Sequence, residues 1–175
     1  MSYSIETGPP QIIQFYYKTE DLFNSVSLRS LYRALNIKSE AGEALIDDFA
    51  ITLDEEDAFD LLIRDAAHEV FQYVLKMCRG VTDALVLDDA IEILGVPDTG
   101  PYYAVHVLDN EAYNANNLEL VENTVKMLLQ VHVLKNWYEM KGHTDEQTKL
   151  MAKYNSLKIK LINKDLFQLR KPLLT

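Results

Sequence analysis

The stretch TLDEEDAFDLLIRDAAHEVFQYVLKMCRG, residues 52–80, decides the fold because it has the most regular pattern in the chain. Thr52 and Glu55 have the Ser/Thr-x-x-Glu spacing of a capping box, which satisfies the free N–H groups at a helix start. Gly80 is a typical helix stop. The stretch is therefore predicted to form a helix about 40 Å long. Its apolar residues at helical spacing are Phe59, Leu62, Ile63, Ala66, Val70, Phe71, Val74 and Met77.

Four consecutive acids, Asp54 to Asp57, open this stretch, and they raise the alternative of a metal site or an acid–base site. Acids in the first turn of a helix are favourable beside the positive end of its dipole, by about 0.3–1 kcal/mol each. On a helix these four positions point in directions that span more than a full turn, so they do not converge on one metal ion. A calcium-binding loop needs spaced acids and a central glycine. We interpret the acids as a cap.

Further helices are predicted where apolar residues recur at helical spacing. They span about 25–37, 83–94, 117–141 and 144–163, and Thr144 with Gln147 has the spacing of another capping box. The first is predicted from apolar residues that lie close to helical spacing, namely Val26, Leu28, Leu31, Ala34 and Leu35. The buried side of the long third helix is expected to contain Leu118, Val121, Val125, Leu128, Leu129, His132, Val133 and Trp137. The last helix is expected to bury Leu150, Tyr154, Leu157 and Leu161.

Two segments, QIIQFYYK at 11–18 and GPYYAVHVLD at 100–109, are rich in the β-branched and aromatic residues that favour extended structure. The predicted fold is mainly α: a helical bundle with two long helices, a C-terminal helix, and short extended arms or a small β element. We expect an N-terminal extended arm at 1–24, a helical connector domain at 25–163 and a C-terminal docking tail at 164–175.

Composition excludes several classes of protein. The chain has 175 residues, of which 48% are apolar and 25% charged, as in an ordinary globular domain. No apolar run approaches the about 18 residues of a membrane span, and MSYSIETGPPQ is not a signal peptide. A cytoplasmic site of synthesis is expected. The net charge of −10 argues against a freestanding nucleic-acid binder, which needs clustered Lys and Arg.

The charge is unevenly distributed along the chain. From Lys149 onward there are seven basic residues and one acidic residue, so residues 1–148 carry a net charge of −16. Such asymmetry is typical of a terminal segment with its own partner, for example an acidic neighbouring copy. The tail is also apolar, and either docks on a neighbouring subunit or folds back on its own core. The predicted docking residues are Leu166, Phe167, Leu169, Arg170, Lys171, Leu173 and Leu174.

The motifs of common enzymes are missing from the sequence, which has no GxxxxGK[ST], GxGxxG, GxSxG or HExxH. The histidines, at 68, 106, 132 and 143, do not have metal-ligand spacing, and His132 is expected to be a hydrogen-bonded core residue. Cys78 is expected at the C-terminal end of a helix, which raises a thiol pKa and so disfavours a nucleophile. We predict no catalysis, no cofactor and no bound metal.

The order of these elements resembles the head–tail connector, or adaptor, proteins of tailed bacteriophages. The resemblance lies in LYRALNI (31–37), in the acidic start and central Ala66-Ala67 of the stretch at 54–80, and in VLKNWYE (133–139). It covers about 28–80 and 118–142. The segments at 1–24, 39–51 and 144–175 go beyond the compact core of that family.

The resemblance implies an α-helical subunit of a ring, usually of twelve copies, that lies below the portal protein in the neck or tail region of the virion. The ring would extend the DNA channel without sequence-specific binding and would dock the next tail or ring protein. The C-terminal part of such proteins often contacts the portal. Two alternatives remain open: a non-viral helical protein–protein interaction adaptor or regulator, and an enzyme with an unrecognised carboxylate site.

Overall fold

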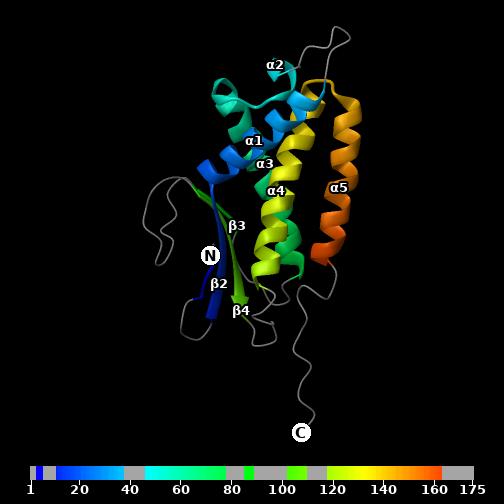
Figure 1. The fold of residues 1–175 in the computed structure, drawn as a ribbon. Coiled ribbons are helices and arrows are strands. Elements are labelled where there is room, and N and C mark those ends of the chain that lie inside the picture. Colours follow the sequence, from blue (N-terminus) through cyan, green and yellow to red (C-terminus); the bar gives the residue numbers. More distant parts are fainter. Residues whose placement is uncertain are drawn as a thin grey trace.

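A computed structural model of the chain describes residues 3–5, 11–37, 46–77, 85–88, 102–109 and 118–162 (Figure 1). The elements are β1 (Tyr3–Ile5), β2 (Gln11–Lys18), α1 (Thr19–Asn36), α2 (Ile46–Phe49), a single 3-10 turn η1 (Leu53–Glu55), α3 (Glu56–Met77), β3 (Leu85–Asp88), β4 (Tyr102–Asp109), α4 (Leu118–Met140) and α5 (Thr144–Ile162). The predicted mainly helical fold with two long helices and a small β element is confirmed.

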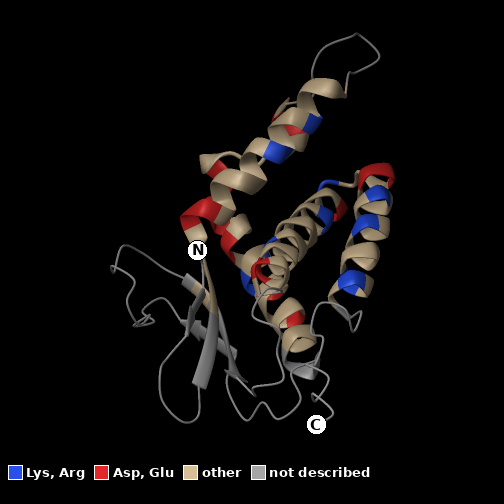
Figure 2. Ribbon diagram, turned by 60° about the horizontal axis from the view of Figure 1, so that its bottom comes forward, with Lys and Arg blue, Asp and Glu red and all other residues tan. Residues whose placement is uncertain are grey.

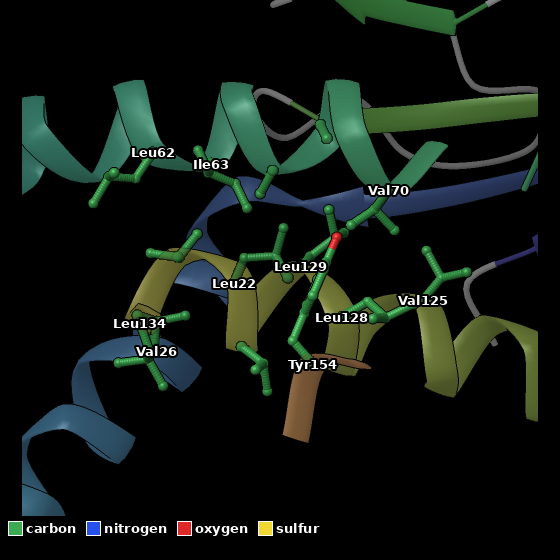
Figure 3. Packing of buried hydrophobic residues seen from close by; sticks show 14 of the residues in the cluster. Leu22, Val26, Leu62, Ile63, Val70, Val125, Leu128, Leu129, Leu134 and Tyr154 are labelled. Atoms are coloured by element: carbon green, nitrogen blue, oxygen red, sulfur yellow. The ribbon is translucent and has the colours of Figure 1, made fainter. Parts of the chain in front are cut away.

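Helix α4 is the centre of the fold and packs against α1, α3 and α5. Figure 3 shows it between α3 on one side and α1 on the other, with Tyr154 of α5 reaching the same core. Every residue of its predicted buried side is buried. Val131, Leu134 and Tyr138 are buried on its other sides as well. A helix covered nearly all round belongs in the interior of a bundle.

Helices α3 and α5 bury the faces that the sequence predicts. On α3 the predicted apolar residues from Phe59 to Val74 are all buried, while the Met77 side chain and Gly80 lie outside the described residues. On α5 the four predicted core residues, Leu150 to Leu161, are buried. The apolar stripe of each helix therefore contacts its neighbours, as expected for amphipathic helices.

Helix α1 begins earlier than predicted and buries only part of its apolar residues. It begins at Thr19, directly after β2, and crosses the predicted boundary at residue 24. Its buried residues are Leu22, Val26, Ser30 and Ala34, spaced four apart, whereas Leu28, Leu31 and Leu35 are exposed. The helix that these residues predict is present, but they do not share one buried face. Burial of Ser30 is possible because its Oγ accepts a hydrogen bond from the Ile51 N–H (2.8 Å) and donates one to the Ser27 carbonyl (2.8 Å).

The β element is an antiparallel sheet with strand order β1-β2-β4-β3. Strand β2, predicted as an extended arm or short strand, pairs with β4 from Gln11↔Asp109 to Lys18↔Tyr102. Tyr17 of β2 is buried, stacks on Phe71 of α3 with ring centroids 6.2 Å apart, and donates a hydrogen bond to the Glu122 carbonyl of α4 (3.2 Å). The sheet therefore shares a core with the helices.

The helix predicted at about 83–94 is wrong at residues 85–88, which form β3, and its other residues lie outside the described ones. Strand β3 pairs with β4 from Leu85↔Val105 to Asp88↔Tyr102. Its Leu-Val-Leu run is a short apolar segment, which periodicity alone does not distinguish from part of a helix. Pairing with β4 satisfies its backbone groups and selects the extended form.

The connection between α4 and α5 is a tight turn built on Gly142, which has a positive φ of 76°. The His143 N–H donates to the Tyr138 carbonyl (2.8 Å) and the Gly142 N–H to the Glu139 carbonyl (3.1 Å). This is the Schellman motif that ends many helices at glycine, as predicted for this position. Helix α5 begins at Thr144 itself, so Thr144 is its first residue rather than the capping residue before it that the sequence predicts.

Candidate functional site

Glu55, one of the four acids at the start of the long helix, forms the predicted capping box with Thr52. The Thr52 N–H donates to Glu55 Oε2 (2.8 Å), and the Thr52 hydroxyl donates to the same oxygen (2.5 Å). Burial raises the pKa of Glu55, but these two hydrogen bonds and the nearby Lys141 lower it more, so the carboxyl lies below its usual range. Asp54, Glu56 and Asp57 are exposed. Within the described ranges no group of three or more His, Cys, Asp or Glu side chains could hold a metal ion.

A second polar cluster, which we call the Glu69 cluster, lies where α3, α4 and α5 meet. Glu69 Oε1 of α3 accepts hydrogen bonds from the hydroxyls of Tyr154 (2.9 Å) and Tyr73 (3.2 Å). The Lys158 ammonium of α5 in turn donates to the Tyr73 hydroxyl (2.6 Å) and lies over its ring. His132 of α4 completes the cluster, with Nε2 3.8 Å from Glu69 Oε2.

The His132 side chain is 1% exposed, and its Nε2 is also 3.3 Å from Asp65 Oδ2. Burial and the Lys135 ammonium lower the pKa of His132 to about 4, although Glu69 and Asp65 act in the opposite direction. The ring is therefore neutral at pH 7. Since Nε2 faces the two carboxylates, it carries the proton, which leaves Nδ1 as the unprotonated nitrogen. Nδ1 is buried and has no hydrogen-bond partner among the described residues.

The burial of His132 determines what the Glu69 cluster can do chemically. A general base must reach the proton that it removes, either directly or through one water molecule. His132 Nδ1 is buried, and the ring packs edge-on against Tyr154 with centroids 5.4 Å apart. The Glu69 cluster therefore joins α3, α4 and α5 through polar contacts. His132 is buried, as predicted for a core histidine, and its Nε2 lies 3.3 Å from Asp65 Oδ2.

In the described part of the chain, exposed acids gather on α2 and at the start of α3, and exposed lysines along α5 after its first turn (Figure 2), although Arg64 of α3 and Asp145 of α5 are exposed as well. Acids are exposed on α2, at Asp47 and Asp48, and at the start of α3. Lysines 149, 153 and 160 are exposed along α5. Where α1 meets α5, the nearly buried Glu146 accepts hydrogen bonds from Arg33 and from Lys149 (2.5 Å). The charge asymmetry of the sequence is therefore also an asymmetry of the surface.

The predicted docking residues of the C-terminal tail all lie outside the described residues, so the tail stays a prediction. Sequence reasoning missed the Glu69 cluster and the exposed leucines of α1. The spacing of Glu69 and Tyr73, four residues apart on one helix, is a signal for their hydrogen bond. The bond from Tyr154 joins residues 85 apart and has no local signal.

Scans of protein-family models and searches of curated proteins and of solved structures found no match to this chain. No helix in the described ranges is both long enough and apolar enough to cross a membrane.

Proposed function

We propose that this chain is a structural virion protein of a tailed bacteriophage. In this proposal it forms a ring below the portal, joins the head to the tail, and extends the channel through which DNA passes. The ring contacts the portal protein on one side and the next tail or ring protein on the other. Its net charge of −10 suits a wall past which DNA moves without being bound, because like charges repel phosphate.

The observation that carries the proposal is that exposed lysines lie along α5 after its acidic first turn, whereas exposed acids lie at the start of α3 (Figure 2). In a ring each subunit presents one surface to the neighbour ahead and a different surface to the neighbour behind. Two complementary surfaces on one chain supply such a contact. A two-fold dimer instead needs one surface that complements itself.

The resemblance to connector proteins gives the second support. Its three stretches fall on elements that are helical in this chain: LYRALNI at the end of α1, the acidic cap with most of α3, and VLKNWYE in α4. Ala66 and Ala67 are both fully buried in α3. Small side chains at these two positions let the neighbouring helices approach α3 closely. Close packing is thus a physical reason for the two alanines in the resemblance.

The proposal is tested by mixing the purified chain with the portal protein encoded in the same genome. The chain alone is expected to be a monomer or a weak, concentration-dependent oligomer, and to form a closed ring once the portal complex is added. Light scattering at low and high salt measures the association, and electron microscopy shows the ring. The contact is expected to weaken at high salt because it depends on exposed charges.

Two outcomes would contradict the proposal. A stable dimer that does not associate with the portal would favour the alternative, a non-viral helical protein–protein interaction adaptor. A source genome without portal and major capsid genes would remove the virion role altogether.

A further inference from the structure

Helix α1 presents an apolar stripe on the side opposite to its core face. The stripe consists of Leu28 (53% exposed), Leu31 (37%), Tyr32 (61%) and Leu35 (47%). These positions follow the 3- and 4-residue spacing of one helix face, so they form a continuous surface. Single exposed leucines are ordinary, but four large apolar residues on one face mark an interaction site.

Cations border this stripe on the side that faces α5. Arg29 and Arg33 lie one turn apart on α1, and Lys153 of α5 lies near both. Burial and these two guanidinium groups lower the pKa of Lys153. Glu146 is the acid that accepts hydrogen bonds here, and it is shared between Arg33 and Lys149. We call the stripe with its cations the basic–leucine surface; it contains Leu28, Arg29, Leu31, Tyr32, Arg33, Leu35 and Lys153.

A surface of the opposite charge lies at the start of α3. Leu53 (75% exposed) and Leu61 (71%) are the two most exposed large apolar residues of the described chain. The exposed carboxylates of Asp54, Glu56 and Asp57 lie between them in the sequence. The cap explains why acids are favourable in this turn, but it does not explain two exposed leucines beside them. We call this set, Leu53, Asp54, Glu56, Asp57 and Leu61, the acidic–leucine surface.

The two surfaces lie on the exposed faces of two helices that each pack against α4. Helix α1 also contacts the start of α3 directly, where Phe23 packs edge-on against Phe59 with ring centroids 5.1 Å apart. The surfaces are made of different residues and carry opposite charge. A head-to-tail contact needs two such different, complementary surfaces on one chain.

We propose that the acidic–leucine surface of one copy docks on the basic–leucine surface of the next copy. The inference rests on the proposed ring and names the two surfaces that would close it. The docking partner is a second copy because this chain itself carries both complementary surfaces. One has exposed leucines beside carboxylates, and the other has exposed leucines beside cations. Leucines at the centre of the contact exclude water, and the charge pairs orient the copies.

The proposal is tested by reversing the charge of each surface separately. One variant carries Arg29→Glu and Lys153→Glu; the other carries Asp54→Lys and Asp57→Lys, which leaves the hydrogen bonds between Thr52 and Glu55 in place. Each variant alone is expected to associate at least about tenfold more weakly than the unchanged chain, because like charges then face each other. A control with Glu119→Lys and Glu139→Lys, at exposed α4 positions outside both surfaces, is expected to associate as the unchanged chain does.

Mixing the two variants gives the decisive result. In an alternating assembly every contact becomes complementary again, so association is expected to return to within about threefold of the original. Recovery also shows that both variants are folded. No recovery from two variants that keep the helical circular dichroism of the unchanged chain would overturn the proposal.

Cross-linking separates a head-to-tail contact from a two-fold one. In a Cys78→Ser background, Asn24→Cys beside the basic–leucine surface and His68→Cys beside the acidic–leucine surface are joined by a bismaleimide. The double variant is expected to give a ladder beyond the dimer, and each single-cysteine variant to stay monomeric. Dimers from a single-cysteine variant would overturn the head-to-tail contact. A ladder without portal binding would support this contact and contradict the virion role. Portal binding without a ladder would support the virion role and contradict this contact.

Discussion

At the scale of single residues, the carboxylate of Glu69 joins α3 to α5 through the Tyr154 hydroxyl and lies beside His132 of α4. Burial raises the pKa of Glu69, but the Tyr154 hydrogen bond, the protonated form of His132 and the Lys135 ammonium lower it more, so the pKa lies below its usual value and the carboxylate is ionised at pH 7. An ionised acceptor strengthens the bond that it receives. The cluster therefore fixes how three helices meet, which apolar packing alone leaves less specific.

Tyr154→Phe is expected to lower the free energy of unfolding by about 1 kcal/mol. The change removes a hydrogen bond to a charged group, which is worth about 1.5–3 kcal/mol in general. Glu69 is 40% exposed, so water recovers part of this loss. Urea unfolding measures the effect. Tyr32→Phe on the exposed face of α1 is the control, and an equal effect of the two changes would show that the Glu69 hydrogen bond contributes nothing.

His132 is expected to make the protein less stable as the pH falls from about 6.5 toward about 4. Its folded pKa is about 4, below the 6.5 of an unperturbed histidine, so the unfolded chain binds more protons in this window. Between pH 7 and pH 5.5 the loss is about 1 kcal/mol. His132→Gln should flatten the dependence measured by urea unfolding, and His68→Gln, at an exposed position, should not. Parallel curves for all three proteins would contradict the assignment.

At the scale of elements, the sequence predicts the long helices well because α3 and α5 each have one strong apolar period and α4 is apolar on nearly all sides. The capping residues of α3 and the Schellman turn at Gly142 are local signals, and both are found in the structure. Helix α1 carries two apolar stripes, and local sequence does not tell which one meets the core. The choice depends on partners that are distant in sequence, namely Ile51, whose N–H bonds to Ser30, and α4, against which α1 packs. Strand β3 likewise depends on its distant partner β4.

Thr52→Ala is expected to destabilise the protein by about 1 kcal/mol, the usual effect of removing a helix cap. The Thr52 hydroxyl is lost as a donor to Glu55, and the start of α3 frays. Thr52→Ser keeps the hydroxyl and should stay within about 0.5 kcal/mol of the unchanged chain. Thermal unfolding followed by circular dichroism measures both. A metal ion found in stoichiometric amount by elemental analysis, and lost on mutation of Asp54 and Asp57, would overturn the reading of these acids as a cap.

At the scale of the whole molecule, the described core is a single cluster around α4. It extends from Phe15 on β2 to Leu161 on α5. Sequence pattern identifies most of its members, since apolar faces must be buried somewhere. The pattern does not identify the outward surfaces, because exposed leucines and core leucines look alike in a sequence. Only the packing of α1 and α3 against α4 shows which leucines are exposed and which belong to the core.

Ending the chain after Lys164 is expected to leave the subunit folded and to abolish ring formation on the portal. Every described member of the core lies at or before Leu161, so the truncated chain keeps all of them. The removed residues include five large apolar side chains with Arg170 and Lys171 among them, the composition of a docking hot spot. Circular dichroism and urea unfolding measure the fold, and light scattering with portal measures docking. A matched full-length variant, Arg170→Gln with Lys171→Gln, should weaken docking less, since its apolar anchors remain. Unfolding of the truncated chain would show instead that the tail folds back on its own core.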